Sequence, residues 1–146
     1  MSITEDFLST AEEQEIVNAI SIAEQQTSGE IRVHIEAHSD LPVLDRAQQV
    51  FSHLEMHKTS ARNGVLFYIG VQDRSFAIIG DKGIDAVVPY DFWESTKKLV
   101  VQHFKENQFK NGLIAGILQT GKQLKNFFPY NETDDINELP NEISRS

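Results

Sequence analysis

Residues 63–81 decide the fold, and they read NGVLFYIGVQDRSFAIIGD. Two apolar runs flank a short polar turn, Gln72-Asp73-Arg74. Runs of β-branched and aromatic residues joined by so few polar residues predict a β-hairpin. Neither run alternates with polar residues, which is typical of strands covered on both faces. We therefore expect helices from elsewhere in the chain to cover both sides of this hairpin.

The segment before the hairpin predicts a helix, a strand and a second helix. Residues 10–13 read TAEE, a capping-box pattern that opens a helix, and residues 27–29 end it. Residues 31–36 alternate strictly, which predicts a strand with one apolar and one polar face. Residues 44–56 carry a helical apolar stripe. A strand, a helix and a strand at this spacing predict a parallel pair with a right-handed crossover.

Two more helices are predicted after the hairpin, over residues 92–104 and from residue 111 to 124. The fold class is therefore α/β, with a short mixed sheet built from a βαβ unit plus the hairpin and flanked by about four helices. Residues 1–128 form a single domain in this interpretation. Residues 129–146 are acidic and lack apolar periodicity, which predicts a flexible tail.

Composition and charge exclude several classes of protein. The 146 residues carry a net charge of −9, with seven acids and no Lys or Arg in residues 1–30. Such a balance argues against nucleic-acid binding, which needs clustered cations. The chain has no Cys, no apolar run of about 20 residues and no basic N-terminal signal region. We therefore expect a cytoplasmic protein that does not insert into a membrane.

Strand direction predicts that polar residues gather at two edges of the sheet. The first edge collects the starts of the two parallel strands and the end of the hairpin's second strand. Carboxylate and amide oxygens there would suit Ca²⁺ or Mg²⁺. In the alternative interpretation, the same side chains cap strand ends and satisfy loop amides. The residues at this edge are Glu30, Lys58, Arg62, Asn63, Asp81 and Asp85.

The second edge lies beyond the carboxyl ends of the parallel strands, where open α/β sheets usually bind ligands. Its residues are His38, Asp40, Asp45, Gln72, Asp73 and Arg74. Asp and Arg in a tight turn are also ordinary turn chemistry. We keep Asp40, Asp73 and Arg74 as a secondary candidate site around a cation.

Familiar catalytic signatures are missing from the sequence. It contains no H-E-x-x-H, no G-x-S-x-G, no P-loop and no G-x-G-x-x-G. No covalent nucleophile and no organic cofactor is therefore indicated.

Five short phrases resemble the TPM domain family and follow in the same order as in that family. They are SGEIRV at 28–33, RNGVL at 62–66, DR at 73–74, GDKGID at 80–85 followed by VP at 88–89, and GLIAG at 112–116. The resemblance covers roughly residues 8 to 128. It implies a three-layer α/β/α sandwich with a short central sheet.

The resemblance also carries functional expectations. Some family members are described as acid phosphatases, and members are associated with divalent cations, notably calcium, in an acidic cleft. The family-like polar positions are Glu30, Asn63 and Asp85. Longer relatives have a signal peptide and a membrane anchor, and this sequence shows neither, so it resembles a stand-alone version.

Two functional hypotheses follow. The first is a domain that binds a divalent cation, with Ca²⁺ favoured and Mg²⁺ as the alternative, and that has at most weak phosphomonoesterase activity. A phosphorylated small molecule or protein would be its other partner. The second is a non-catalytic protein-interaction module that uses loops 38–42, 57–62 and 81–88. The predicted metal ligands are Glu30, Asn63, Asp81 and Asp85, and the predicted catalytic residues are Glu30, Asp85 and Arg62; whether the chain is an enzyme stays open.

Overall fold

A mixed sheet forms the centre of the computed structural model, which describes residues 7–130 and 137–146. Strand β1 (Glu30–Glu36) pairs in parallel with β2 (Gly64–Gly70), and β2 pairs antiparallel with β3 (Ser75–Gly80). The short β4 (Ser144–Arg145) joins the free edge of β1 in parallel. The strand order is β3-β2-β1-β4 within the described residues.

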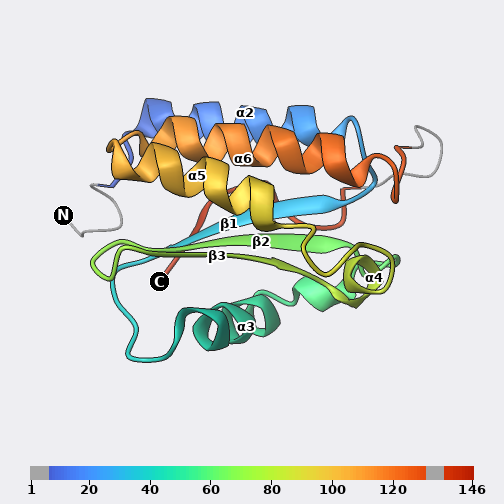
Figure 1. The fold of residues 1–146 in the computed structure, drawn as a ribbon, viewed down its shortest axis with the longest axis horizontal. Helices are drawn as coiled ribbons and strands as arrows, with labels where there is room; N and C mark the ends of the chain where they lie inside the picture. Colours follow the sequence, from blue (N-terminus) through green and yellow to red (C-terminus); the bar gives the residue numbers. More distant parts are fainter. Residues whose placement is uncertain (1–6, 131–136) are drawn as a thin grey trace.

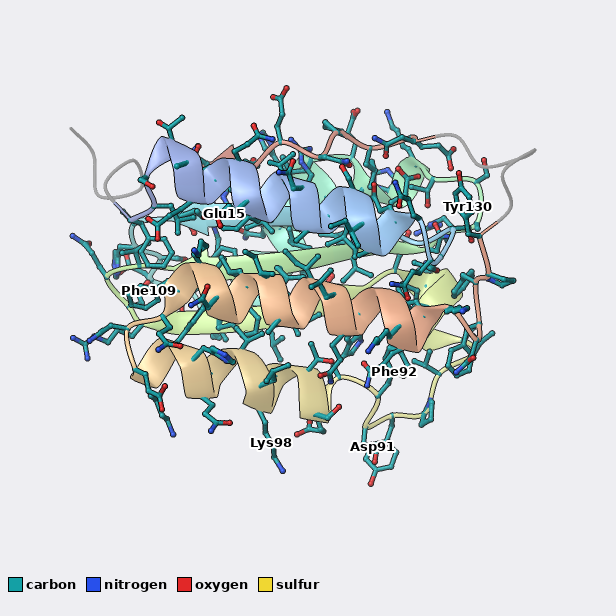
Figure 2. The ribbon with its side chains drawn as sticks, turned by 90° about the horizontal axis from the view of Figure 1, so that it is seen from above. Glu15, Asp91, Phe92, Lys98, Phe109 and Tyr130 are labelled. Carbon is teal, nitrogen blue, oxygen red and sulfur yellow. The ribbon has the colours of Figure 1, made fainter. Side chains whose placement is uncertain are left out.

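Helices cover both faces of the sheet (Figure 1). Helices α2 (Thr10–Glu24), α6 (Phe109–Leu124) and α5 (Glu94–Lys105) lie side by side on one face, in that order (Figure 2). Helix α3 (Val43–His53) covers the other face, and the short elements η1 (Met56–Lys58) and α4 (Lys82–Asp85) lie at one end. The arrangement confirms the predicted three-layer α/β/α sandwich with a βαβ unit and a hairpin.

The first helix begins one residue earlier than the sequence predicted. Ser9, and not Thr10, is the N-cap residue, and its hydroxyl accepts a hydrogen bond from the Glu12 amide. The Glu12 carboxylate in turn accepts from the Ser9 amide, which completes the capping box. The sequence TAEE fits the same pattern shifted by one position. The pattern therefore predicted that a helix begins here, but it did not identify the N-cap residue correctly.

Strand β2 is buried along its whole length, as its unbroken apolar run predicted. Phe67 points toward α5 and α6 and joins the larger core cluster there. Leu66 and Tyr68 point the other way and pack with residues of α3. The sheet therefore separates two apolar cores, and its polar ends are where functional groups can reach solvent.

Close packing between α5 and α6 explains the helical glycines. A Cβ on Gly116 would lie 2.4 Å from Val100 Cγ2, and one on Gly112 would lie 2.8 Å from His103 Cβ. Any larger residue at these positions would therefore push the two helices apart.

Residues 137–146, which the sequence placed in a tail, pack along β1 and end in β4. Leu139 is buried in the core on the α3 side. The domain boundary at 128 and the flexibility of residues 129–146 stay predictions. No helix in the described part of the chain is long and apolar enough to cross a membrane.

Candidate functional site

The first edge of the sheet forms as strand direction predicted. Glu30 lies opposite Gly64 in the parallel pair, and its amide donates to the Asn63 carbonyl over 3.2 Å. The Asp81 amide donates to the Gly64 carbonyl over 2.9 Å. Glu30, Asn63 and Asp81 therefore all lie at one end of the sheet, and all three are buried.

The carboxylate of Asp81 is held by its neighbours. The Arg62 guanidinium donates to both Asp81 oxygens, over 2.8 and 3.0 Å. Asp81 is also the N-cap residue of α4, and its carboxylate accepts a hydrogen bond from the Lys82 amide over 2.7 Å. Burial, and then the charge of Asp81, raise the pKa of Asp85. Arg62 itself has a left-handed backbone with φ 51°. The charge of Arg62 therefore offsets the charge of Asp81.

Glu30 takes part in a different group, on the β1 side of the edge. One of its oxygens accepts a hydrogen bond from the Leu139 amide over 2.6 Å. The Glu24 carboxylate accepts from the Ile31 amide over 2.9 Å, which brings the end of α2 against the start of β1. The two carboxyl groups therefore face the same region of the molecule.

The pKa of both carboxyl groups is raised to about 7. For Glu24 the main cause is burial, and the charge of Glu30 adds to it. For Glu30 the main cause is also burial, and the nearby Glu138 carboxylate adds to it. A carboxyl group with a pKa near 7 holds its proton to a much higher pH than an ordinary Glu does, so both groups are partly protonated at neutral pH.

A cavity of about 280 Å³ opens beside the two carboxyl groups. It lies between the end of α2, the start of β1 and the C-terminal segment, at the end of the molecule where Figure 2 labels Tyr130. Oxygen-bearing side chains dominate its wall. They are Ser21, Glu24, Gln25, Thr27, Ser28, Glu30, Tyr130, Asn137 and Asn141.

The structure thus divides the predicted ligand set. Glu30 lines the cavity, and Asn63 approaches it indirectly, because its side-chain amide lies 3.4 Å from the Ser28 hydroxyl. Asp81 and Asp85 do not line it. Across residues 7–130 and 137–146, no three His, Cys, Asp or Glu side chains come together as metal ligands. Lys58, the other cation of this edge, pairs with Glu55 over 3.0 Å.

The second edge gathers around His38. Its Nδ1 lies 2.5 Å from Asp73, and its Nε2 lies 2.7 Å from Asp40. These hydrogen bonds, above all the one to Asp73, raise the pKa of His38 and favour its protonated form. The two carboxylates occupy opposite sides of one imidazole, so in this arrangement they do not converge on a single ion. The neighbouring Arg74 has a left-handed backbone with φ 51°, and the cation site proposed for this edge stays a prediction.

Glu24 is the site residue that the sequence did not reveal. It was not singled out among the candidate residues, and it lies at the end of α2, in its last turn. A carboxylate in that turn faces the negative end of the helix dipole, which is unfavourable unless another group stabilises it. An acid there, six residues before Glu30 and just ahead of the strand, was the available signal.

The family model of the TPM domain matches residues 2–136. The chain belongs to the TPM domain family. The resemblance found in the sequence is therefore confirmed. None of the curated proteins matches the chain.

Solved structures agree with this assignment. The NMR structure of BA42 protein from the psychrophilic bacterium Bizionia argentinensis is 50% identical, covers 100% of both chains and superposes with a TM-score of 0.92. The N-terminal domain of a P. gingivalis protein is 18% identical over 86% of this chain and 83% of its own, with a TM-score of 0.69. The N-terminal domain of cg2496 protein from Corynebacterium glutamicum is 12% identical over 93% and 79%, with a TM-score of 0.63. At such low identity, the last two support the fold of this TPM domain alone.

Proposed function

We propose that this TPM domain binds a divalent cation in the cavity beside Glu24 and Glu30. The observation that carries the proposal is the pair of carboxyl groups, each with its pKa raised to about 7, on the wall of one cavity. Binding a cation would offset both the burial of the carboxylates and their mutual repulsion. Glu24 thereby joins Glu30 as a ligand, while Asp81 and Asp85 serve the structure of the α4 loop.

The donor set of the cavity fits a hard cation. Its wall offers two carboxylates together with amide and hydroxyl oxygens, and it includes no Cys or His. Calcium accepts irregular sets of six to eight oxygens, whereas Mg²⁺ demands a near-octahedral site. Calcium is therefore the favoured ion. With two acidic ligands among the described residues, we expect a dissociation constant on the order of 10⁻⁴–10⁻³ M.

Phosphomonoester hydrolysis is the weaker part of the proposal. A bound cation would polarise a phosphoryl oxygen and lower the pKa of its water. Of the three predicted catalytic residues, Glu30 alone lines the cavity, while Arg62 is committed to Asp81 and Asp85 lies beside that pair. Efficient phosphoryl transfer needs preorganised positive charge, so we expect cation binding with at most slow turnover.

Titration with Ca²⁺ and Mg²⁺, followed through amide NMR shifts, tests the proposal. We expect shifts at residues 24–31 and 137–141, and we expect them to be abolished by Glu24→Gln combined with Glu30→Gln. Asp81→Asn with Asp85→Asn is the matched control and should keep the response. A parallel assay with a generic phosphomonoester measures turnover.

Three results would refute the proposal. Shifts confined to residues 81–85 would return the site to the α4 loop. Shifts around His38 and Asp73 would move it to the second edge. No shift with either ion at millimolar concentration would remove cation binding altogether.

A protein-interaction role is the second candidate. Apolar side chains are exposed on the segments that the sequence identified as adaptable loops and directly beside them. They are Leu41, Leu44, Val87 and Tyr90, and Tyr90 is fully exposed. This role would be favoured over cation binding if a partner protein changes the amide NMR shifts of Val87 and Tyr90. In the same experiment, Ca²⁺ should leave the amide shifts of the cavity residues unchanged.

A further inference from the structure

Strand β1 carries a row of polar side chains on the face that it shares with α3. The row consists of Glu30, Arg32, His34 and Glu36, at every second position of the strand. Glu30, His34 and Glu36 are buried, and the Nε atom of Arg32 is buried with no hydrogen-bond partner among the described residues. Buried polar groups destabilise a fold unless they are paired. The partners of this row therefore matter.

The first half of the row is met by residues 139–142. The Leu139 amide donates to Glu30 over 2.6 Å. Glu142 lies near enough to Arg32 for its charge to raise the pKa of that guanidinium against the effect of burial. Both partners come from the C-terminal segment.

The second half of the row is met by the last residues of the same segment. His34 Nδ1 lies 2.9 Å from the Ser144 hydroxyl, and His34 Nε2 lies 2.7 Å from the Ser146 hydroxyl. The Ser146 hydroxyl also donates to Glu36 over 3.0 Å. The backbones pair in parallel at this point, with His34 opposite Ser144. Glu30, His34 and Glu36 therefore each have a hydrogen bond to one extended segment, while Arg32 is influenced only by the charge of Glu142. Glu36 also accepts hydrogen bonds from Arg46 and Tyr68, which lie outside that segment.

An apolar anchor completes the contact. Leu139 is 6% exposed and packs with Met56, Leu66 and Tyr68 in the core on the α3 side. A Cβ on Gly64 would lie 3.6 Å from Leu139 Cδ1, so the leucine sits directly on the start of β2. Leu139 thus fixes the register of the segment, and the polar row then forms hydrogen bonds and charge contacts with the residues that follow it.

Most of the contact is of a kind that exchanges easily. Only two residues of the segment form β-pairs with β1. Leu139 is its one fully buried apolar side chain, and Ile143 packs half-buried against the larger core. The other contacts described above are hydrogen bonds and charge pairs, which water can replace at small net cost. β4 is the outermost strand, so β1 would become an edge strand if β4 left it, and an edge strand is a template for an extended chain.

We propose that the polar row of β1 and the leucine socket beside it form a peptide-binding groove, which the chain's own residues 137–146 occupy and an extended segment of another protein can enter. Recognition is by strand addition, with backbone pairing for affinity and alternate side chains for selectivity. The partner chemistry follows from the resident segment. It carries a leucine, an acid three residues later, and hydroxyl residues five and seven residues after the leucine, as Leu139, Glu142, Ser144 and Ser146 do.

A fluorescein-labelled peptide with the sequence of residues 137–146 tests the groove, using the full chain. The resident segment competes with the peptide, so wild-type protein should bind it weakly. Leu139→Ala in the chain weakens the competitor and leaves the groove intact. We expect saturable binding to this variant, roughly tenfold or more tighter than to the wild-type chain. We also expect the peptide to raise the melting temperature of the variant, because a ligand of the native state stabilises it.

A control peptide with Leu→Asp at position 139 and Ser→Ala at positions 144 and 146 should neither bind nor stabilise. NMR of the wild-type chain titrated with unlabelled peptide provides a readout that does not depend on the variant. We expect the peptide to change the amide shifts of residues along β1. The proposal is overturned if Leu139→Ala shows no saturable binding at about 1 mM peptide, or if the control peptide binds equally. Dimerisation of the wild-type chain that is lost in Leu139→Asp would identify a second copy, and not a foreign segment, as the occupant.

Discussion

Replacing Glu30 by Gln should make this domain more stable at alkaline pH and leave it unchanged at acidic pH. The pKa of Glu30 is raised from 4.5 to about 7, mainly by burial. A carboxyl group whose pKa is higher in the folded state contributes stability that is fully present below the unfolded pKa of 4.5. That contribution is lost as the pH rises through about 7. Gln is uncharged at every pH and still offers an oxygen to the Leu139 amide, so the variant keeps the contribution.

The magnitude follows from the two pKa values. Each unit of difference between folded and unfolded states corresponds to about 1.4 kcal/mol, so Glu30 contributes about 3 kcal/mol at most. Solvent that enters the open cavity screens the charge, so the true figure is smaller. Removing the charge of Glu30 also relieves Glu24, whose own pKa is raised partly by that charge, and this effect adds to the gain. We expect Glu30→Gln to gain roughly 1–3 kcal/mol at pH 8 and nothing at pH 4.5.

Urea unfolding of both proteins in EDTA, between pH 4.5 and pH 8.5, measures the effect. The wild-type free energy of unfolding should fall across this range relative to that of the variant. Glu106→Gln, which changes an exposed acid, is the control and should run parallel to wild type. Curves of Glu30→Gln and wild type that stay parallel at all pH values would refute the burial argument. Calcium should restore wild-type stability at pH 8 and leave Glu30→Gln nearly unaffected.

Three further perturbations test the packing and the buried network. Tyr68→Phe removes a hydroxyl that donates to the buried Glu36 carboxylate, and we expect a loss of about 1–3 kcal/mol in urea unfolding at pH 7. Acidification should destabilise the domain. Burial lowers the pKa of His34 to about 4. Burial would raise the pKa of Glu36, but hydrogen bonds, first of all the one from Arg46, lower it to about 2. Both groups contribute stability above their unfolded pKa values, and circular dichroism should record its loss as the pH falls from about 6.5 toward 2. Gly116→Ala places a Cβ 2.4 Å from Val100 Cγ2, which should cost about 1–3 kcal/mol in the same urea assay.

Matched variants separate these effects from general sensitivity to substitution. Tyr90→Phe removes a fully exposed hydroxyl and should be neutral. Lys122→Ala changes an exposed position of α6 and should also be neutral. Losses of equal size in the test and control variants, or a free energy of unfolding that stays flat below pH 6, would contradict the reasoning.

Local pattern was sufficient for the central part of the fold. The unbroken apolar run of β2 predicted burial on both faces, because a strand under two helical layers has no wet side. Strand direction then placed Glu30, Asn63 and Asp81 at one end of the sheet. These conclusions depend on contacts between neighbours in the sequence or between consecutive elements, which periodicity and chain direction encode.

The remainder depends on contacts between distant residues. The alternation of β1 correctly predicted an apolar and a polar face, but nothing local shows that residues 137–146 cover the polar one. A polar segment with one leucine carries no periodicity, since its partners are supplied by β1 and not by itself. In the same way, nothing local shows that Asp81 is paired with Arg62, whereas Glu24 and Glu30 line the cavity. Proximity along an edge does not say which acid is already neutralised.

Glu30 belongs to both proposed sites, because it lines the cavity and accepts the Leu139 amide that anchors the C-terminal segment. Asn137 and Asn141 likewise line the cavity and belong to that segment. Displacing the segment would therefore remove neutral oxygens from the proposed cation site, and the two ligands should oppose each other. Glu36 lies at the far end of the row and does not line the cavity, so Glu36→Gln should weaken the peptide and leave Ca²⁺ binding unchanged. If calcium and peptide bind independently, the groove and the cavity are separate sites, and the shared residues have only a structural role.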